Sequence, residues 1–452
     1  MKLLLVSAVD PGKEFEAREP SLGLGYIAAC LGQHMPSVEI KIVDRDLENA
    51  LQRFGPDLVG VSCVSQNFGL ATAIGERCRA LGIPVFIGGV HISALPASLP
   101  RCMDFGVIGE GERTVVEVLR RFDAGGLDPH ELQGIRGLVL RAPNGRVFAT
   151  EPRTLIEPLD SLPFPARDLL GIRRTSRIHL FSSRGCPYSC RFCFSSRFWQ
   201  KVRFLSPRYV LRELEHVIDA YAPAQIAFWD DLFIADRPRL SEIVRLVEAR
   251  KINEKVEFYV TARANLVTPQ IVDLLRRLNV AMVSMGLESG CQNTLSYLKG
   301  KVTVAQNRTA IALLKAAGIY VNATFIIGSP LEEEQEILRT LDFVRDSDLD
   351  TFTVYPLTPY PGTAVWEYAL ARGLVSDRDM DWSALAIDWD DRPGQKLVLS
   401  EKVSRERLSE LYQLFQAERR KRRILYGLSR GLRQPRFVIR AIQARMPQLS
   451  GR

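Results

Sequence analysis

The chain has 452 residues, 46% hydrophobic and 25% charged, an ordinary composition for a globular protein with a sizeable core. At roughly 100–200 residues per domain, this length predicts two or three domains. No stretch of about 18 uncharged apolar residues occurs, which excludes a membrane-spanning helix. The net charge of +8 is uneven: Glu418–Arg452 holds eleven Lys or Arg against one acid, or +10, which leaves about −2 for the rest.

The N-terminal apolar run ends by Val9, which is too short for the apolar region of a secretory signal, and no small-residue cleavage site follows it. We therefore expect a cytoplasmic protein with reduced thiols. Five of the eight cysteines are scattered in apolar contexts and are expected to be core residues: Cys30, Cys63, Cys78, Cys102 and Cys291.

Residues 1–125 alternate short β-branched runs with amphipathic stretches. Strands are predicted at Leu3–Ala8, Glu39–Val43, Leu58–Cys63, Pro84–Ile87 and Phe105–Ile108. Helices are predicted at Leu22–Gly32, Leu47–Phe54, Leu70–Leu81 and Glu112–Phe122. This alternation with short connections indicates an α/β, doubly wound (Rossmann-like) domain with a parallel sheet. Ligands of such sheets bind at the C-terminal ends of the strands.

Residues 126–175 break the alternation. Gly137–Leu140 and Val147–Thr150 flank Pro143-Asn144-Gly145, a strong hairpin signal, and an extended linker is predicted to follow. From 176 to 375 the alternation resumes, with strands predicted at 178–183, 225–229, 256–261, 281–286, 320–327 and 351–356. Helices are predicted at 207–220, 238–250, 268–277, 304–316, 332–345 and 364–372. Six β/α units in succession predict a partial (β/α)6 barrel.

Residues 376–452 are predicted to form a helical, basic C-terminal region, with helices at Ser404–Arg423 and Pro435–Ala444. Basic and apolar residues mix at helical spacing in this tail. A solvated basic helix and an interfacial helix on anionic lipid both fit such a pattern. We do not expect a nucleic acid partner, because no known binding module or aromatic platform accompanies the charge.

Three cysteines stand close together directly after the first strand of the predicted barrel, in Arg184-Gly185-Cys186-Pro187-Tyr188-Ser189-Cys190-Arg191-Phe192-Cys193. Closely spaced thiolates on a loop hold iron–sulfur clusters, and three ligands leave one iron of a four-iron cluster open for catalysis. A structural zinc ion is the alternative, but it needs a fourth ligand, and the nearest histidine, His179, lies inside a predicted strand.

The C-x3-C-x2-C spacing with an aromatic residue, Phe192, before the last cysteine resembles the radical S-adenosylmethionine (SAM) superfamily. The resemblance implies that Cys186, Cys190 and Cys193 hold a [4Fe–4S] cluster, and that SAM chelates the open iron and yields a 5′-deoxyadenosyl radical. The protein then supplies orientation and protection of that radical.

Other strand ends fit the same family, and the resemblance implies that they contact SAM. Asp230 and Asp231 follow the second barrel strand and resemble the cobalamin-linked branch of the superfamily. Arg263 follows the third strand, as a partner for the SAM carboxylate. The remaining implied SAM contacts end the fourth and fifth strands: Glu288, Ser289, Gly328 and Pro330.

The N-terminal domain resembles the cobalamin-binding domain fused to radical SAM barrels. The resemblance rests on Pro20-Ser21-Leu22-Gly23-Leu24-Gly25, on Gly88-Gly89-Val90-His91 and on Gly109-Glu110-Gly111-Glu112. The cobalamin contacts that it implies are Ser62, Ser65, Gln66, Asn67, Gly88, Gly89, His91, Glu110 and Gly111. The Asp-x-His-x-x-Gly motif that supplies a lower cobalt ligand is absent from the sequence, so cobalamin is expected to bind without a histidine ligand. A domain that binds no cofactor is the alternative.

Together these resemblances cover roughly residues 1–375. They imply a cobalamin-dependent radical SAM enzyme that methylates an unactivated carbon through the 5′-deoxyadenosyl radical and methylcobalamin. A ring-forming or rearranging enzyme, similar to the anaerobic porphyrin cyclase group, is the alternative. The expected partners are a small-molecule, lipid or natural-product substrate and an external electron donor similar to flavodoxin or ferredoxin, with peripheral membrane contact through the basic tail as a further hypothesis.

Overall fold

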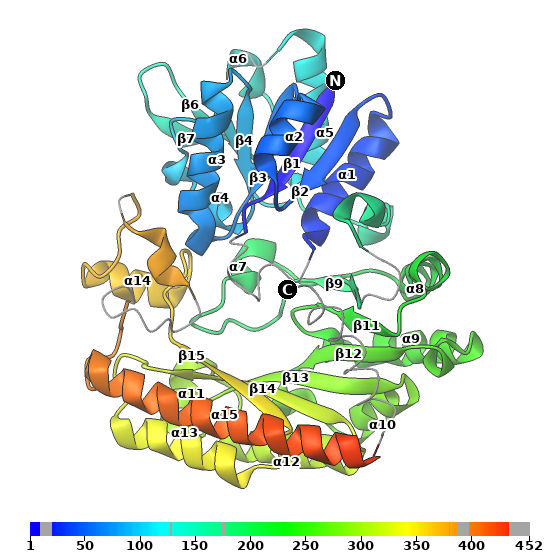
Figure 1. Cartoon of the computed structure of the whole chain (residues 1–452), viewed down its shortest axis with the longest axis vertical. Coiled ribbons are helices and arrows are strands. Elements are labelled where there is room, and N and C mark those ends of the chain that lie inside the picture. The colour runs from blue at the N-terminus through cyan, green and yellow to red at the C-terminus, as the bar shows by residue number, and fades with distance from the viewer. Residues whose placement is uncertain (10–19, 127–128, 173–176, 379, 387–396, 434–452) are drawn as a thin grey trace, which may run out of the picture. The chain divides into compact units, whose positions relative to one another are not determined.

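The computed structural model describes residues 1–9, 20–126, 129–172, 177–378, 380–386 and 397–433, with side chains described up to Ile424. The chain forms two compact units, each described by itself below (Figure 1). The first unit comprises Met1–Tyr259, Arg277–Asn279 and Thr358–Leu397. The second comprises Val260–Arg276, Val280–Leu357 and Val398–Arg452. The four-part domain division made from the sequence stays a prediction.

The first unit begins with a seven-stranded sheet in the order β2-β1-β3-β4-β5-β6-β7. Its strands are β1 (Lys2–Ser7), β2 (Glu39–Val43), β3 (Leu58–Ser62), β4 (Val85–Gly88), β5 (Phe105–Val107), β6 (Leu138–Arg141) and β7 (Val147–Ala149). The first five strands pair in parallel, and β6 and β7 add antiparallel strands at one edge. The doubly wound domain predicted from the sequence is therefore confirmed, and so is the hairpin at Pro143-Asn144-Gly145.

Helices connect these strands because parallel neighbours need a crossover. They are α1 (Leu22–His34), α2 (Leu47–Phe54), α3 (Phe68–Ala80), α4 (Val90–Ala94), α5 (Gly111–Gly125) and α6 (Pro129–Leu132). The short helix at Val90–Ala94, which includes His91, is not among the helices predicted from the sequence. Five residues are too few to show helical periodicity, and the turn is stabilised locally, since the Ser93 hydroxyl donates to the Gly89 carbonyl at 2.8 Å.

A second sheet has the order β15-β14-β13-β12-β11-β8. Its strands are β8 (Ile178–Leu180), β11 (Gln225–Phe228), β12 (Glu257–Ala262), β13 (Val280–Glu288), β14 (Tyr320–Ile327) and β15 (Thr351–Pro356). The first unit holds β8, β11 and the start of β12, and the second holds the end of β12 and the rest. Sequential parallel strands confirm the predicted partial-barrel sheet.

The helices that follow these strands in the first unit are α7 (Ser195–Trp199), α8 (Pro207–Tyr221), α9 (Arg237–Ala249) and α14 (Ala364–Ala371). Those of the second unit are α11 (Gln292–Leu298), α12 (Val304–Ala316), α13 (Glu334–Asp346) and α15 (Arg405–Arg433). The helix α10 (Pro269–Arg277) precedes β13. Their starts follow capping chemistry, as at Ser206, whose side chain accepts from the Tyr209 amide ahead of Pro207 at the first helical position.

The predicted strand 178–183 splits at its C-terminal end. After β8 the chain continues into β9 (Ser183–Arg184), which pairs antiparallel with β10 (Arg203–Phe204). The backbone amides of Ser182 and Ser183 donate to the Asp230 carboxylate at 2.6 and 3.1 Å. Those amides are no longer available to a neighbouring strand, so the regular ladder ends there.

In the second unit, α15 packs against β15 and α13, burying Leu408, Leu411 and Phe415 (Figure 1). This confirms the helix predicted at Ser404–Arg423, whereas the helix predicted at Pro435–Ala444 lies outside the described residues. Within the described part of the chain, no helix is both long and apolar enough to cross a membrane.

Candidate functional site

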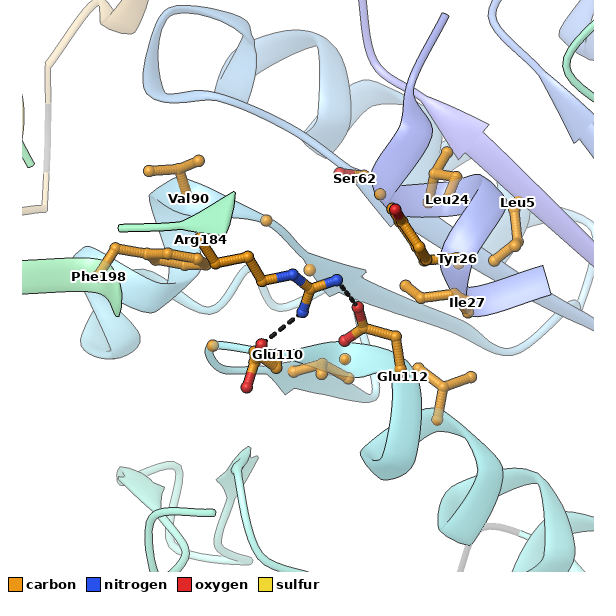
Figure 2. Close-up of a pocket in the computed structure, with 18 of the residues that line it drawn as sticks. Leu5, Leu24, Tyr26, Ile27, Ser62, Val90, Glu110, Glu112, Arg184 and Phe198 are labelled. Atoms are coloured by element: carbon orange, nitrogen blue, oxygen red, sulfur yellow. Dashed lines mark hydrogen bonds and ion pairs between the residues drawn. The ribbon is translucent and has the colours of Figure 1, made fainter. Parts of the chain in front are cut away.

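A cavity of about 390 Å³ lies within the first unit, at the C-terminal ends of the β1–β5 strands. One part of its lining comes from the N-terminal domain, including Leu24 and Tyr26 of α1 and the turn Gly109–Glu112. The other part comes from the segments on either side of the cysteine motif and after β11, including Arg184, Phe198 and Asp231. Figure 2 shows the side chain of Arg184 extending toward Glu110 and Glu112.

Small residues at the strand ends keep the backbone side of the cavity open. Ser62, Gly88 and Gly89 line it after β3 and β4. Gly89 has φ +98°, and a Cβ there would lie 2.6 Å from the carbonyl oxygen of Cys63. Only glycine fits this position, because the left-handed backbone is strained for other residues and neighbouring backbone fills the space.

Large apolar side chains face the cavity without being covered. Val90 is 39% exposed and Trp229 is 40% exposed, although both line a concave site. Phe198 and Trp199 stand beside the same cavity, with their rings 4.6 Å apart in an edge-to-face arrangement. Exposed aromatic and aliphatic surface around glycine-rich strand ends fits a large, flat ligand with apolar faces, such as a corrin ring.

The structure brings five of the nine predicted cobalamin contacts to this lining: Ser62, Gly88, Gly89, Glu110 and Gly111. Ser65, Gln66 and Asn67 form a short 3-10 turn and are not among the lining residues. The Asn67 side chain donates to the Ala8 carbonyl at 3.0 Å and so ties β1 to this turn.

His91 also lies off the cavity lining, fully buried in the N-terminal domain. Its two ring nitrogens each lie 3.1 Å from a hydroxyl, one of Ser65 and the other of Ser98. Its ring packs against Phe68 and Trp382 at centroid distances of 3.9 and 4.5 Å. Burial lowers the pKa of His91 to about 3, so the imidazole is neutral at ordinary pH. Both of its ring nitrogens already lie within hydrogen-bond distance of hydroxyls in the protein.

The cysteine motif forms a loop between β9 and α7, which we call the cluster loop (Cys186–Cys193). The three cysteines form no disulfide and are partly exposed, and the Cys193 amide donates to the Cys190 carbonyl at 3.2 Å. Burial raises the pKa of the Cys193 thiol to about 12, so its sulfur is held as a thiolate only when a cation binds it. Three thiols on one loop, without a fourth protein ligand in the motif, fit a [4Fe–4S] cluster.

Among the described residues, the cluster loop included, no group of three His, Cys, Asp or Glu side chains is arranged to hold a single metal ion. A cluster places each thiolate on a different iron, so its ligands do not converge on one point. Of the five scattered cysteines, Cys30, Cys63, Cys78 and Cys291 are buried and Cys102 is partly exposed.

Two neighbouring segments pack against the cluster loop and the residues beside it. Gly185, just before it, has φ +97°, and a Cβ there would lie 2.7 Å from the Lys201 carbonyl. Phe194, just after it, lies against Gly362, which leaves no room for a side chain at that glycine. The Val365 amide donates to the carbonyl of Arg191 inside the loop at 3.3 Å. The loop is therefore held by β10 on one side and by the segment before α14 on the other.

Asp230 and Asp231 have different surroundings. The Asp230 carboxylate is buried and accepts from the amides of Ser182 and Ser183 and from the Ser182 hydroxyl. These donors account for both of its oxygens, so Asp230 orders the strand ends. The Asp231 carboxylate lines the cavity and accepts from the Ser195 hydroxyl at 2.6 Å. Its pKa is raised because the surrounding protein removes water that would solvate the charge.

The other predicted SAM contacts belong to the second unit, except Phe192, which is partly exposed in the cluster loop. The Arg263 guanidinium is buried and donates to the carbonyls of Lys299 and Gly300 at 3.2 and 2.7 Å. Glu288 has φ +63° and pairs with the Lys299 ammonium at 3.1 Å. Both side chains therefore hold the loop after α11.

Ser289 is fully buried and its hydroxyl lies 2.9 Å from that of Thr340. The amide of Gly328 donates to the Glu332 carboxylate at 2.8 Å, and the Pro330 carbonyl accepts from Glu401 at 2.8 Å. The turn after β14 is thus fixed by one buried acid, which the sequence reasoning did not select. Its signal was position, because Glu332 follows Gly328-Ser329-Pro330 directly after the strand.

Sequence reasoning also missed the charge network beside the cavity. Arg184 pairs with Glu110, and with Glu112 at 2.5 Å, while Arg203 pairs with Glu110 at 2.9 Å. Although burial alone raises the pKa of Glu110, hydrogen bonds from Arg203 and the charge of Arg184 hold it below its usual value. The available signal was the Arg184-Gly185-Cys186 order, which puts a cation two residues before the first cysteine.

Two family models match the chain: the radical SAM superfamily over residues 180–344 and the B12 binding domain over residues 11–119. A relative from Pyrococcus horikoshii, the uncharacterized methyltransferase PH0819, is 29% identical over 84% of this chain and 86% of its own length. The anaerobic magnesium-protoporphyrin IX monomethyl ester cyclase of Rubrivivax gelatinosus is 25% identical over 77% of this chain, which spans only 66% of that relative.

Among solved structures, the radical SAM methyltransferase TsrM from Kitasatospora setae, with cobalamin and a [4Fe–4S] cluster bound, superposes with a TM-score of 0.72. It is 17% identical, and the match covers 92% of this chain and 88% of that one. This likeness shows a shared fold.

The two matched domains, their order and the fold define a radical SAM enzyme that carries an N-terminal B12-binding domain. The chain thus combines a B12-binding domain with a radical SAM domain, and the cofactors that this combination indicates are a [4Fe–4S] cluster, SAM and cobalamin.

Proposed function

We propose that this enzyme methylates an unactivated carbon of a small-molecule, lipid or natural-product substrate. The observation that carries the proposal is that Arg184 and Asp231 both border the cavity, while Arg184 stands two residues before the cluster loop and Asp231 accepts a hydrogen bond from Ser195, two residues after it. A reaction that uses both cofactors needs them beside one another, and methyl transfer to carbon is such a reaction. The similarity to an uncharacterized methyltransferase supports it.

When bound, the cluster and SAM supply a 5′-deoxyadenosyl radical, and cobalamin supplies the methyl group as methylcobalamin. Cys186, Cys190 and Cys193 would hold three irons and leave the fourth open. Phe192 and Phe194 flank Cys193 and keep an apolar surface beside it. We propose that this apolar surface limits the access of water to a reactive intermediate.

The cobalamin would lie over Ser62, Gly88, Gly89, Glu110 and Gly111, with Val90 and Trp229 covered by the ring. His91 is held by Ser65 and Ser98, so its ring is not proposed as a cobalt ligand. This agrees with the expectation that cobalamin binds without a histidine below it. Among the predicted cobalamin contacts, the turn formed by Ser65, Gln66 and Asn67 instead holds His91 and the end of β1 in place.

For SAM, we propose direct contacts from Asp231 and Phe192, both of which belong to the first unit. Asp230, Arg263, Glu288 and Ser289 shape the neighbouring strand ends, because their polar atoms already have protein partners. Their role in SAM binding is therefore proposed to be the positioning of backbone.

A ring-forming or rearranging reaction is the second candidate, favoured by the similarity to the Rubrivivax cyclase. Methylation adds one methyl group to the mass of the product, whereas ring formation does not. Mass spectrometry of the product from deuterated-methyl SAM therefore separates the two. Retention of the label in the product supports methylation, and an unlabelled product formed together with 5′-deoxyadenosine contradicts it.

The first experiment measures iron, sulfide and corrinoid in anaerobically reconstituted protein. A four-iron cluster together with bound cobalamin supports the proposal, and absence of corrinoid after supplementation contradicts the methyl-transfer half of it. Cys190→Ala is expected to abolish SAM cleavage, because one iron loses its protein ligand. Undiminished 5′-deoxyadenosine from that variant would remove the cluster assignment.

We further propose that an external electron donor of the flavodoxin or ferredoxin class reduces the cluster. The basic residues at the end of α15 are proposed to contact anionic surfaces, including membranes. Arg422 is not part of that surface, because its guanidinium donates to the carbonyls of Leu349, Val344, Arg345 and Ser347. Binding to vesicles with and without anionic lipid tests the membrane contact, and equal binding to both would contradict it.

A further inference from the structure

Both ends of the cluster loop are tied to the walls of the cavity. Arg184 stands two residues before Cys186, and Ser195 stands two residues after Cys193. Arg184 lines the cavity itself, and Ser195 is held by Asp231, which lines the cavity. This arrangement is independent of any single predicted cofactor contact.

At the first end, the Arg184 guanidinium pairs with the carboxylates of Glu110 and Glu112 (Figure 2). Both acids belong to the turn after β5 that lines the cavity. The guanidinium also lies 5.3 Å from the ring centroids of Tyr26 and Trp199. Arg184 therefore contacts α1 and the Gly109–Glu112 turn of the N-terminal domain as well as α7, which follows the cluster loop.

These charges leave Arg184 little freedom. The side chains of Arg184, Glu110 and Glu112 are 10%, 4% and 6% exposed, and Arg203 completes a set of two cations and two anions. The Glu110 carboxylate also accepts from the Ile156 amide at 2.7 Å. Any rotation of Arg184 away from its partners would leave buried charge unpaired, which is strongly unfavourable.

Between Arg184 and Cys186, Gly185 passes any displacement to the loop. Its left-handed backbone lies against the Lys201 carbonyl, so the backbone cannot rearrange freely. The Gly185 amide hydrogen-bonds to the Asp231 carboxylate, which also accepts from the Ser195 hydroxyl at 2.6 Å. Asp231 thus joins Gly185, the residue before the first cysteine, to Ser195, which stands two residues after the last.

We propose that Arg184 is a positioning residue that couples occupancy of the cavity to the geometry of the cluster loop, so that each cofactor strengthens binding of the other. This inference rests on the proposed function for the identity of the two cofactors. The Gly109–Glu112 turn contacts whatever fills the cavity, and Arg184 carries the position of that turn to Cys186. Coupling between two binding sites is reciprocal, so it can be measured from either side.

The test measures the dissociation constant of hydroxocobalamin for the full-length protein before and after anaerobic reconstitution with iron and sulfide. We expect cluster-loaded wild-type protein to bind at least about fivefold more tightly, the lower end of typical coupling. In Arg184→Gln, the ratio of the dissociation constants without and with the cluster should fall below about twofold, because the two forms of the protein then bind hydroxocobalamin with similar affinity. The readout is an absorption titration and needs no substrate or turnover.

Arg167→Gln is the matched control. Arg167 forms a fully buried pair with Glu213 at 2.6 Å in the same unit, and it does not line the cavity. This variant should lose comparable thermal stability yet keep the wild-type ratio. If Arg184→Gln does not fold, Glu112→Gln and Asp231→Asn replace it, and each is expected to lower the ratio.

A wild-type ratio near one, or an unchanged ratio in Arg184→Gln, overturns the coupling while the proposed function stands. Wild-type protein that binds no hydroxocobalamin in either state overturns the proposed cobalamin site and the coupling with it. A lowered ratio in Arg167→Gln as well would show that any buried ion pair has this effect, which also overturns the role of Arg184.

Discussion

Substitution of His91 by glutamine is expected to remove a pH dependence of stability from the N-terminal domain. His91 is fully buried, and its neighbours are the hydroxyls of Ser65 and Ser98 and the rings of Phe68 and Trp382. None of these groups stabilises an imidazolium ion by charge. Glutamine offers a donor and an acceptor at similar reach but does not titrate.

The sign and size follow from the pKa values. Burial lowers the pKa of His91 from 6.5 to about 3, so below pH 6.5 the unfolded chain binds a proton that the folded chain refuses. Stability therefore falls as pH falls from 6.5 toward 3 and is fully retained above 6.5. At about 1.4 kcal/mol for each pH unit, the loss attributable to His91 between pH 7 and pH 5 is about 2 kcal/mol.

Urea denaturation of the wild type and of His91→Gln at pH 7, 6 and 5 gives the unfolding free energy of each protein. The difference between the two proteins isolates the contribution of His91, because all other titrating groups are shared. The variant should gain about 2 kcal/mol of unfolding free energy relative to the wild type as the pH falls from 7 to 5. Parallel losses of stability in the two proteins would refute the reasoning, because they would mean that His91 charges in the folded state.

Three further changes probe other parts of the molecule. Phe415→Ala in α15 removes a fully buried ring that contacts Phe352 and should cost about 3–5 kcal/mol of unfolding free energy in chemical denaturation. Gly185→Ala places a Cβ against the Lys201 carbonyl and should cost about 1–3 kcal/mol, with reduced iron incorporation on reconstitution. Burial raises the pKa of Glu332 from 4.5 to about 7, so wild-type stability is present below pH 4.5 and is lost as pH rises through 7. Glu332→Gln should gain about 3 kcal/mol relative to the wild type between pH 4.5 and pH 8 in denaturant titrations.

Each of these expectations has a contrary result. A loss below about 1 kcal/mol for Phe415→Ala would mean that α15 does not pack as described. Wild-type stability and iron content in Gly185→Ala would show that the loop tolerates a Cβ. If the difference in unfolding free energy between wild type and Glu332→Gln did not change with pH, the pKa of Glu332 would be the same in the folded and the unfolded protein.

The sheet strands and most helices follow from local patterns, and the sequence predicts them well. Most parallel strands are β-branched runs bounded by turn residues. Two of them, the partly exposed Glu39–Val43 and the largely buried Tyr320–Ile327, form over the same residues as predicted. The cluster loop was recognisable for the same reason, because its chemistry lies in three closely spaced residues. Such features need no knowledge of distant neighbours.

Features that depend on tertiary contacts were not predictable in this way. The end of β8 is set by Asp230, which lies 48 residues further along the chain from Ser182. Arg184 finds Glu110 and Glu112 at sequence separations of 74 and 72 residues. No periodicity records such pairs, so the sequence did not reveal that the Glu110 carboxylate pairs with two arginines.

The first unit is built from segments that lie far apart in the sequence, and this affects how the protein folds during synthesis. Met1–Tyr259 is made first, but Thr358–Leu397 of the same unit emerges only after most of the second unit has been translated. That late segment carries Gly362 and Val365, the packing partners of the cluster loop. A nascent chain that ends before them holds all three cysteines in a loop that lacks one of its two supports. Iron insertion should therefore be post-translational, and a fragment cut after Tyr259 should not retain its cluster.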